Sequence, residues 1–389
     1  MNRVALLFAN RTFGNCLARA VETTIDDYAV DVFSGVPVRH RVSLVRRGEY
    51  DLLIADEPIG NGPLASVLAR ALDVPFALVL RGWADLTNAH GEHGWLRDRS
   101  IAARTRWSTR AADALFVLSD VTRERLAGRY SVDRALTVGR PIDVAHCRSG
   151  TMEPSTDEFT ALTVTNLRYE GKFEGVKTVL DGLESVFERH ASLRYRIAGN
   201  GQYLPSLREY VAAHPYGDRI DVLGWRSDVP EVLSAANLFV YVSYLDAYPT
   251  AVLEAQAAGL PVVGGDAVGV PASVGPAGHV APATPPGIAA AIGRVLDDES
   301  YCAALARRSE TRLDTYNERA AHQYVAAWNT VIDDGRLRKD MLPALDAPPG
   351  RPSVLAAHSD GSSATPTDRD TPEAASIRPS ASSEEVNAS

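Results

Sequence analysis

The sequence has few cysteines, few lysines and no long apolar run. Its 389 residues include only Cys16, Cys147 and Cys302, an odd and scattered set without C-x-x-C spacing. This excludes a disulfide framework and gives no sign of a thiolate metal site. No apolar stretch approaches the roughly 18 residues that cross a bilayer, and no export signal is obvious. The sequence therefore predicts a globular protein of a reducing compartment, and we expect the cytoplasm.

Lysine is far rarer than arginine, because 37 of the 40 cationic residues are Arg and the others are Lys172, Lys177 and Lys339. The formal net charge is −9, with a basic excess within residues 1–150 and an acidic remainder. An acidic chain without a known nucleic-acid-binding motif argues against nucleic acid as a partner. At about 100–200 residues per domain, the length predicts two domains and a tail.

Short apolar runs alternate with helical stretches along most of the chain. Continuous apolar strands between helices favour parallel sheets covered on both faces, so the expected class is α/β with two doubly wound, Rossmann-like domains. The expected strands are 4–9, 28–33, 51–55, 76–80, 114–119, 161–165, 193–198, 220–223, 238–243 and 260–263. The expected helices include 62–72, 97–112, 174–190, 204–214, 229–235, 250–258, 286–296, 299–314 and 317–332.

A polar stretch at 147–158 separates the two series of strands. We expect a first domain over 1–155 and a second over 156–316. A C-terminal helix within 317–342 is expected to pack back toward the first domain. The tail, 343–389, is rich in Pro, Ser, Ala and acidic residues, with too few apolar groups to offset the entropy of ordering. Its composition predicts disorder.

Open α/β sheets bind ligands at the carboxyl ends of their strands, so the loops there hold the candidate site residues. The loop 166–176, N-L-R-Y-E-G-K-F-E-G-V, places Arg168 and Lys172 beside the start of a helix. Both cations could reach one bound anion, because unpaired N–H groups at a helix N-terminus attract negative charge. In the alternative, Lys172 is a solvated charge that pairs with Glu170 or Glu174.

A second candidate segment, 243–263, reads S-Y-L-D-A-Y-P-T-A-V-L-E-A-Q-A-A-G-L-P-V-V. Asp246 lies in the loop after a strand, Pro249 suits a first helical turn, and Glu254 falls one turn inside the helix. The segment therefore offers two carboxylate acceptors, Asp246 and Glu254, at different depths along one ligand, with the amides of 248–251 between them. A sugar nucleotide, which has hydroxyls at both ends and a charged centre, fits this pattern. The alternatives are a helix-dipole role for Glu254 and an ordinary turn carboxylate for Asp246.

The stretch 160–300 resembles the donor-binding domain of the family 4 (group 1) retaining glycosyltransferases, which have the GT-B fold. Their signature is an E-x7-E motif with L-E-A-x-A-x-G-x-P-V-V, and this chain has D-x7-E with L-E-A-Q-A-A-G-L-P-V-V. The resemblance implies two domains facing a central cleft. It also implies metal-independent transfer of a hexose-type sugar from a UDP- or GDP-linked donor to a hydroxyl acceptor, in glycan or polysaccharide biosynthesis, without a cofactor.

The resemblance further implies a role for each matching residue. Lys172 holds the diphosphate and stabilises the leaving group, with Arg168 replacing a family Arg that is missing a few positions earlier. Asp246 binds the transferred sugar, and its side chain is one methylene shorter than the Glu of the family. Glu254 binds the ribose. The segment Tyr248, Pro249 and Thr250 contacts the sugar or the diphosphate.

Three glycines complete the expected donor-binding set. Gly199 and Gly201 form a G-x-G turn after a strand, for which a structural role comes first. Gly14 lies in F-A-N-R-T-F-G-N, where relatives often have a glycine-rich loop that approaches the donor. Two positions depart from the family: Arg81 stands where many relatives have His, and Ala272 where a Glu is common.

The stretch 95–110 carries five Arg and two Trp on an expected helix. Basic residues beside interfacial aromatics suit an anionic membrane surface, through which a lipid-linked acceptor would be reached. An ordinary solvated helix with inward-facing Trp residues is equally consistent with the pattern. His90 and His93 lie nearby but lack a third ligand at suitable spacing, so no metal site is expected.

Two alternatives to a glycosyltransferase remain open on the sequence. One is a GT-B epimerase that acts on the nucleotide sugar itself. The other is a degenerate scaffold that serves as a partner subunit, which Asp246, Ala272 and the missing Arg would explain. A Rossmann oxidoreductase is disfavoured, because neither domain shows G-x-G-x-x-G after its first strand with an acidic residue about 20 positions later.

Overall fold

The fold is described over residues 1–89 and 91–341 of a computed structural model. The tail at 343–389, for which the composition predicts disorder, lies outside the described residues, and so does His90.

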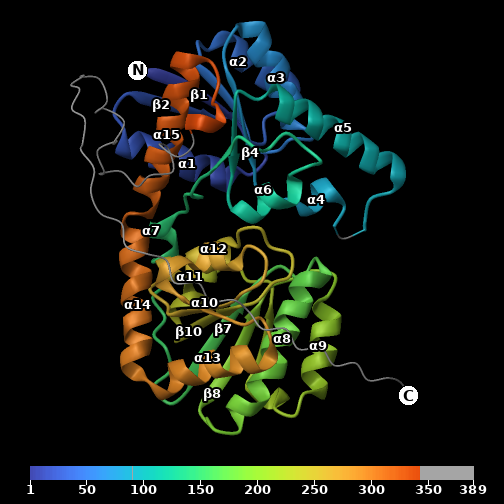
Figure 1. Cartoon of the computed structure of the whole chain (residues 1–389). Helices are drawn as coiled ribbons and strands as arrows, with labels where there is room; N and C mark the ends of the chain where they lie inside the picture. The colour runs from blue at the N-terminus through green and yellow to red at the C-terminus, as the bar shows by residue number, and fades with distance from the viewer. Residues whose placement is uncertain (90, 342–389) are drawn as a thin grey trace, which may run out of the picture. The chain divides into compact units, whose positions relative to one another are not determined.

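The first half of the chain builds a six-stranded parallel sheet (Figure 1). Its strands are β1 (Asn2–Leu7), β2 (Tyr28–Val32), β3 (Leu52–Ala55), β4 (Phe76–Leu80), β5 (Ala114–Val117) and β6 (Ala135–Thr137). Their order in the sheet is β2-β1-β3-β4-β5-β6. The order reverses next to β1, so the sheet is doubly wound, as expected.

The second half builds another six-stranded parallel sheet. Its strands are β7 (Phe159–Val164), β8 (Leu193–Ala198), β9 (Ile220–Gly224), β10 (Leu238–Tyr241), β11 (Val262–Gly265) and β12 (His279–Ala281). They follow the order β12-β11-β10-β7-β8-β9. Two doubly wound α/β sheets therefore succeed one another along the chain, which confirms the expected fold class.

Helices connect the strands and cover the sheets (Figure 1). Those of the first half are α1 (Arg11–Thr24), α2 (Val38–Arg47), α3 (Asn61–Leu72), α4 (Ala84–Thr87), α5 (Trp95–Ala111), α6 (Asp120–Leu126) and α7 (Val144–Cys147). Those of the second half are α8 (Glu170–Phe187), α9 (Leu204–Ala213), α10 (Val229–Ser234), α11 (Thr250–Ala257), α12 (Val270–Val274), α13 (Pro285–Asp297), α14 (Glu299–Asp314) and α15 (Tyr316–Asp334). In the described part of the chain, three short 3-10 helices occupy Gly217–Arg219, Gly275–Ala277 and Lys339–Met341.

Both faces of the first sheet are buried, which explains its continuous apolar strands. In β1, Val4 and Leu6 join one hydrophobic core, while Ala5 and Leu7 join the core on the opposite face. Successive side chains of a strand point to opposite faces, so a strand covered on both sides needs apolar residues at every position.

Helix α15 contributes to the core of the first sheet although it follows the second sheet in the chain. Its Trp328 side chain is fully buried in the same core as Val4 and Leu6. The helix also packs along α1, and the Tyr28 hydroxyl donates a hydrogen bond of 2.6 Å to Asn329. A buried face on α15 thus ties the end of the second half to the first sheet.

Some boundaries of helices and strands differ from those that the sequence predicts. The first strand ends at Leu7 rather than residue 9, and the expected loop at 8–15 becomes helical from Arg11. The Asn10 side chain caps this helix by accepting a hydrogen bond from the Phe13 amide. Strands β6 and β12 were not predicted, because each has only three residues. No helix among the described residues is long and apolar enough to cross a membrane.

Candidate active site

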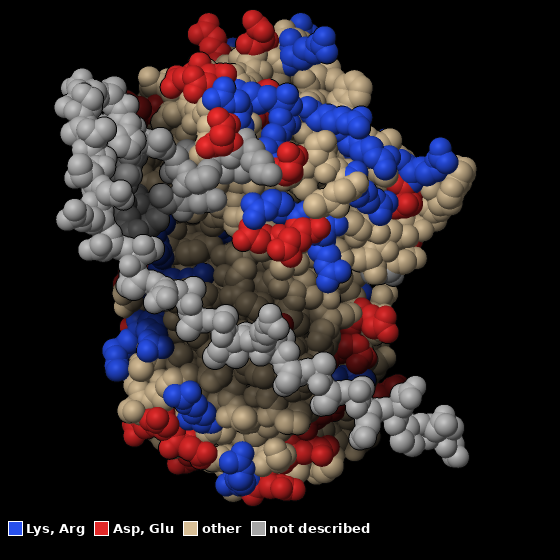
Figure 2. Space-filling view, in the orientation of Figure 1, with Lys and Arg blue, Asp and Glu red and all other residues tan. Residues whose placement is uncertain are grey.

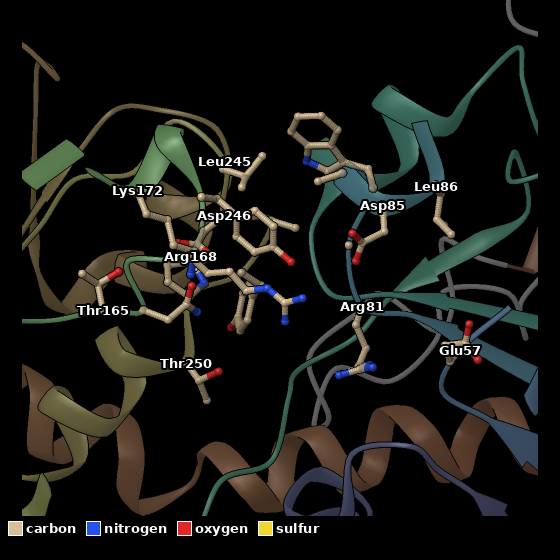
Figure 3. Close-up of a pocket in the computed structure, with 18 of the residues that line it drawn as sticks. Glu57, Arg81, Asp85, Leu86, Thr165, Arg168, Lys172, Leu245, Asp246 and Thr250 are labelled. Atoms are coloured by element: carbon tan, nitrogen blue, oxygen red, sulfur yellow. Dashed lines mark ion pairs between the residues drawn. The ribbon is translucent and has the colours of Figure 1, made fainter. Parts of the chain in front are cut away.

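A cavity of about 740 Å³ lies at the carboxyl ends of strands from both sheets. Loops after β3, β4 and β6 line it from the first half of the chain, and loops after β7 and β10 line it from the second half. Figure 3 shows Lys172, Asp246 and Arg168 on one side of this cavity and Arg81 on the other. Open α/β sheets bind ligands at the carboxyl ends of their strands, so the cavity lies where a site is expected. Most of the predicted site residues line it.

Lys172 and Asp246 form an ion pair at the wall of the cavity. The Lys172 Nζ lies 2.8 Å from Asp246 Oδ1, and the two side chains are only 10% and 16% exposed. The Tyr241 hydroxyl donates a hydrogen bond of 2.7 Å to the other carboxylate oxygen, Oδ2. Burial, followed by the Asp246 charge, holds the pKa of Tyr241 well above its usual value, so it stays a donor. Asp246 is therefore held by two fixed donors.

Helix α8 places Lys172 there because two glycines let it approach β10 closely. A Cβ on Gly175 would run into the backbone carbonyl of Val242, which follows β10. A Cβ on Gly171 would lie 3.2 Å from the Leu245 Cβ, and the Gly171 carbonyl accepts a hydrogen bond of 3.0 Å from the Tyr244 amide. The loop predicted up to residue 173 is helical from Glu170, so Lys172 stands in the first helical turn. Neither acidic neighbour pairs with it, and Glu174 pairs instead with Lys177.

Arg168 also lines the cavity, on the loop after β7. Its guanidinium stacks 5.7 Å from the ring of Tyr169 and forms no hydrogen bond with the described residues. The turn at 199–201, which follows β8, packs directly against this loop. A Cβ on Gly199 would meet the Thr165 carbonyl, and a Cβ on Gly201 would meet the backbone of Leu167. Gly199 and Gly201 therefore position the Arg168 loop and do not themselves line the cavity.

The N-terminus of α11 opens into the same cavity. Pro249 is its N-cap residue and makes no side-chain cap hydrogen bond, so the amides of Thr250 and Ala251 lack an intrahelical partner. The Ser243 hydroxyl accepts hydrogen bonds from the Leu245 and Asp246 amides at 3.3 and 3.2 Å and fixes the preceding loop. Tyr248, Pro249 and Thr250 all line the cavity. An uncapped helix start beside Lys172 favours an anionic group.

Glu254 lies deeper, one turn inside α11, and also lines the cavity. Its carboxylate has no hydrogen-bonding partner among residues 1–89 and 91–341. Burial raises the pKa of Glu254, while the Arg140 and His146 charges lower it. An unpaired carboxylate acceptor at this depth suits ligand hydroxyl groups.

Two functional residues were missed by the sequence interpretation. Arg140 lines the cavity from the loop after β6, and the strand-end rule would have found it had that three-residue strand been predicted. Its backbone amide donates to the Tyr316 hydroxyl at 3.0 Å. Tyr241 reads as core within an apolar strand, and nothing in the pattern signals that its hydroxyl reaches Asp246.

Gly14 and Ala272 are not brought to the cavity. Gly14 lies inside α1, where a Cβ would come within 2.8 Å of Val32 and 3.4 Å of Phe8. The expected loop that approaches the donor is not formed at Gly14, because Asn10 starts the helix before it. Gly14 thus serves close packing of α1 on the sheet.

Arg81 stands after β4, on the wall of the cavity that the first half of the chain builds. Its Nε lies 3.2 Å from the Asp56 carbonyl oxygen and 3.4 Å from Asp56 Oδ2. The buried Asp56 carboxylate also accepts hydrogen bonds from the Ala9 and Asn10 amides at 2.7 and 3.0 Å. This network fixes the direction of Arg81 and leaves its terminal nitrogens without a hydrogen bond among the described residues.

The basic helix predicted at 95–110 is α5, and its tryptophans do not pack inward. Trp95 and Leu96 are 68% and 73% exposed, and Trp107 is 59% exposed although its indole donates to the Ser66 hydroxyl. Figure 2 shows Lys and Arg gathered over α2, α3 and α5. We call the exposed parts of these three helices the basic face. Within the described ranges, no group of three or more His, Cys, Asp or Glu side chains could hold a metal ion.

Two family models match the chain. The model described as Glycosyl transferases group 1 matches residues 152–312, and the model described as Glycosyltransferase Family 4 matches residues 28–146. Together they cover most of both α/β halves.

The curated relatives of this chain share limited sequence identity with it. A subunit of the phosphatidylinositol N-acetylglucosaminyltransferase of Arabidopsis thaliana is 27% identical over 163 residues, which cover 41% of this chain and 36% of that protein. The glycogen synthase of Mycobacterium tuberculosis (strain ATCC 25618 / H37Rv) is 28% identical over 259 residues, 64% of this chain and 61% of that protein. The chain thus spans less than two thirds of either relative.

Among solved structures, Anabaena Alr3699/HepE in complex with UDP and glucose matches with a TM-score of 0.64 at 15% identity. The match covers 85% of this chain and all of that one (100%). At this identity the likeness concerns the fold, and it confirms the expected GT-B architecture.

Proposed function

This chain belongs to the group 1 glycosyltransferase family, and we propose that it transfers a sugar from a nucleoside-diphosphate sugar to a hydroxyl acceptor. The ion pair of Lys172 with Asp246 beside the uncapped start of α11 carries this proposal. The Lys172 ammonium and the free amides at the start of α11 suit a diphosphate. The Asp246 carboxylate, which lines the same cavity, suits the hydroxyl groups of a sugar. The proposed process is glycan or polysaccharide biosynthesis.

The donor would lie along the second-domain side of the cavity. Lys172 and Arg168 would hold the diphosphate together with the amides of Thr250 and Ala251. Asp246 would accept hydrogen bonds from the sugar, and Glu254 would accept them from the ribose. We propose a UDP- or GDP-linked donor; the ribose that Glu254 would contact is common to both.

We propose that transfer retains the anomeric configuration. The bond between the anomeric carbon and the diphosphate oxygen breaks while the acceptor oxygen attacks from the same face. The acceptor proton passes to the leaving phosphate oxygen, so no protein base is needed. Lys172 and Arg168 would then act mainly on the charge that develops on the diphosphate, without a metal or a cofactor.

Incubation of the purified chain with a panel of UDP- and GDP-linked sugars, with water or a supplied alcohol as the acceptor, tests this proposal. Release of free nucleoside diphosphate, undiminished by EDTA, is expected, and the anomeric configuration of the product reports retention. An epimerised nucleotide sugar without free diphosphate would favour the epimerase instead. Absence of both release and binding would favour a degenerate partner subunit.

We also propose a lipid-linked acceptor, reached from the cytoplasmic face of a membrane through the basic face. The supporting observation is the exposure of Trp95 and Leu96 at the start of α5, between one and two turns before Ile101, which lines the cavity. Exposed aromatic and apolar side chains among arginines suit an anionic bilayer surface. Co-sedimentation with vesicles of anionic lipid should fall for Trp95→Ser/Leu96→Ser and persist for Trp225→Ser, a Trp that is 70% exposed in the second domain. Equal sedimentation of both variants would contradict the proposal.

A further inference from the structure

Two arginines on the first-domain wall have no part in the proposed donor contacts. Arg81 and Arg140 follow β4 and β6, whereas the proposed contacts to the donor come from segments 165–172 and 246–254. Both side chains line the cavity.

Most of the hydrogen-bonding capacity of these two arginines is unused. Among the nitrogens of Arg81, only Nε makes a polar contact with a described residue, which is Asp56. The Arg140 guanidinium lies 5.2 Å from the ring of Phe13 and forms no hydrogen bond or ion pair with the described residues. An arginine has five N–H donors, and those of Arg81 and Arg140 that no described residue accepts are not among the buried unpaired atoms, so they are open to the cavity. A ligand group with several acceptor oxygens would satisfy them.

The two cations also stand close enough to repel each other. Burial lowers the pKa of Arg140, and the Arg81 charge lowers it further, while Glu254 opposes the shift. Because a guanidinium stays protonated in proteins, the repulsion persists and is offset only in part by Asp56, which pairs with Arg81, and by the Glu254 charge. An anion between the two side chains would remove it.

We propose that Arg81 and Arg140 form a subsite for a phosphate group carried by the acceptor. The inference rests on the proposed function, since it assigns the first-domain wall to the acceptor. Arginine binds phosphate oxygens through two parallel hydrogen bonds, which gives orientation as well as affinity. The acceptor class is therefore a phosphorylated alcohol, with its reactive hydroxyl directed toward the sugar held by Asp246.

Ligand-induced thermal stabilisation of the full chain tests the subsite. The protein is first saturated with the nucleoside diphosphate that binds, and glycerol 3-phosphate is then titrated at constant ionic strength, with glycerol as the uncharged probe. In the wild type, glycerol 3-phosphate should add stability beyond that of the nucleotide, and glycerol should not. Arg81→Gln and Arg140→Gln should each weaken glycerol 3-phosphate binding about tenfold to a hundredfold.

The controls separate the alternatives. Arg104→Gln, an exposed residue of α5 outside the cavity, should keep wild-type affinity for glycerol 3-phosphate. Arg140→Lys should keep part of it, which distinguishes lost charge from lost folding. Nucleotide affinity should be unchanged in Arg81→Gln and Arg140→Gln.

Three results would overturn the subsite. One is a loss of nucleotide affinity in both variants, which would assign the arginines to the donor diphosphate. Another is equal glycerol 3-phosphate binding by the wild type, Arg81→Gln and Arg140→Gln. The third is no glycerol 3-phosphate binding by a wild type that binds the nucleotide. Failure of the proposed function is distinct, because the wild type would then bind no nucleoside diphosphate in the first step.

Discussion

Replacing Lys172 by Ala probes the site where its charges are most tightly coupled. The substitution removes the ammonium 2.8 Å from Asp246 Oδ1 and leaves that carboxylate with the Tyr241 hydroxyl as its remaining side-chain donor. Breaking a fully buried pair costs about 3–5 kcal/mol. Water in the cavity can solvate Asp246, so we expect a smaller loss of about 1–3 kcal/mol in the free energy of unfolding.

The effect of Lys172→Ala on turnover should be larger than its effect on folding. Removing one preorganised donor to a developing negative charge costs about 10²–10³ in kcat. We expect a loss of that size in release of nucleoside diphosphate from the donor, at a temperature where the variant remains folded. Steady-state kinetics and urea unfolding on the same preparation separate the two effects.

Lys177→Ala is the matched control, because Lys177 lies on the same helix and forms an exposed pair with Glu174. Such pairs contribute about 0–1 kcal/mol, so its activity and stability should match the wild type. Adding Asp246→Asn to Lys172→Ala removes the unpaired carboxylate and should restore stability but not kcat. Wild-type turnover by Lys172→Ala, or recovery of kcat in the double variant, would refute the reasoning.

Three further substitutions test other parts of the site. Burial raises the pKa of Glu254 above its unfolded value, so the folded wild type loses stability as the pH rises through the interval between the two values. Glu254→Gln cannot ionise, so urea unfolding across a pH series should show it gaining stability relative to the wild type toward higher pH. Gly201 has a positive φ, and the Cβ of Gly201→Ala would run into the backbone of the loop after β7. The temperature of thermal unfolding should therefore fall, and nucleotide affinity should fall with it. Tyr316→Phe removes the acceptor of the Arg140 amide and the 2.8 Å contact with the Tyr248 hydroxyl, which should cost about 1–3 kcal/mol in urea unfolding.

The fold could be predicted because burial on both faces forces continuous apolar strands. β4 and β8 match their predicted ranges residue for residue. β6 and β12 escaped prediction because three residues carry too little pattern to distinguish a strand from a loop. The start of α1 escaped because it depends on one capping side chain, Asn10, in a stretch that reads as polar loop.

The site was predictable where spacing along one segment sets the geometry. Asp246, Thr250 and Glu254 lie in a single strand-loop-helix unit, so their distances follow from local structure. The pairing of Lys172 with Asp246 was not predictable, because it depends on how closely α8 packs on β10. Contacts between separate elements are set by packing, which sequence spacing does not encode.

The most direct test of the account is calorimetric titration of the wild type and Lys172→Ala with UDP and with GDP. The account predicts that the wild type binds one of these nucleotides with a stoichiometry of about one per chain, and that Lys172→Ala binds it roughly tenfold or more weakly, since a charge-assisted hydrogen bond contributes about 1.5–3 kcal/mol. Lys177→Ala should bind as the wild type does. A wild type that binds neither nucleotide, or equal affinity in Lys172→Ala, would contradict it.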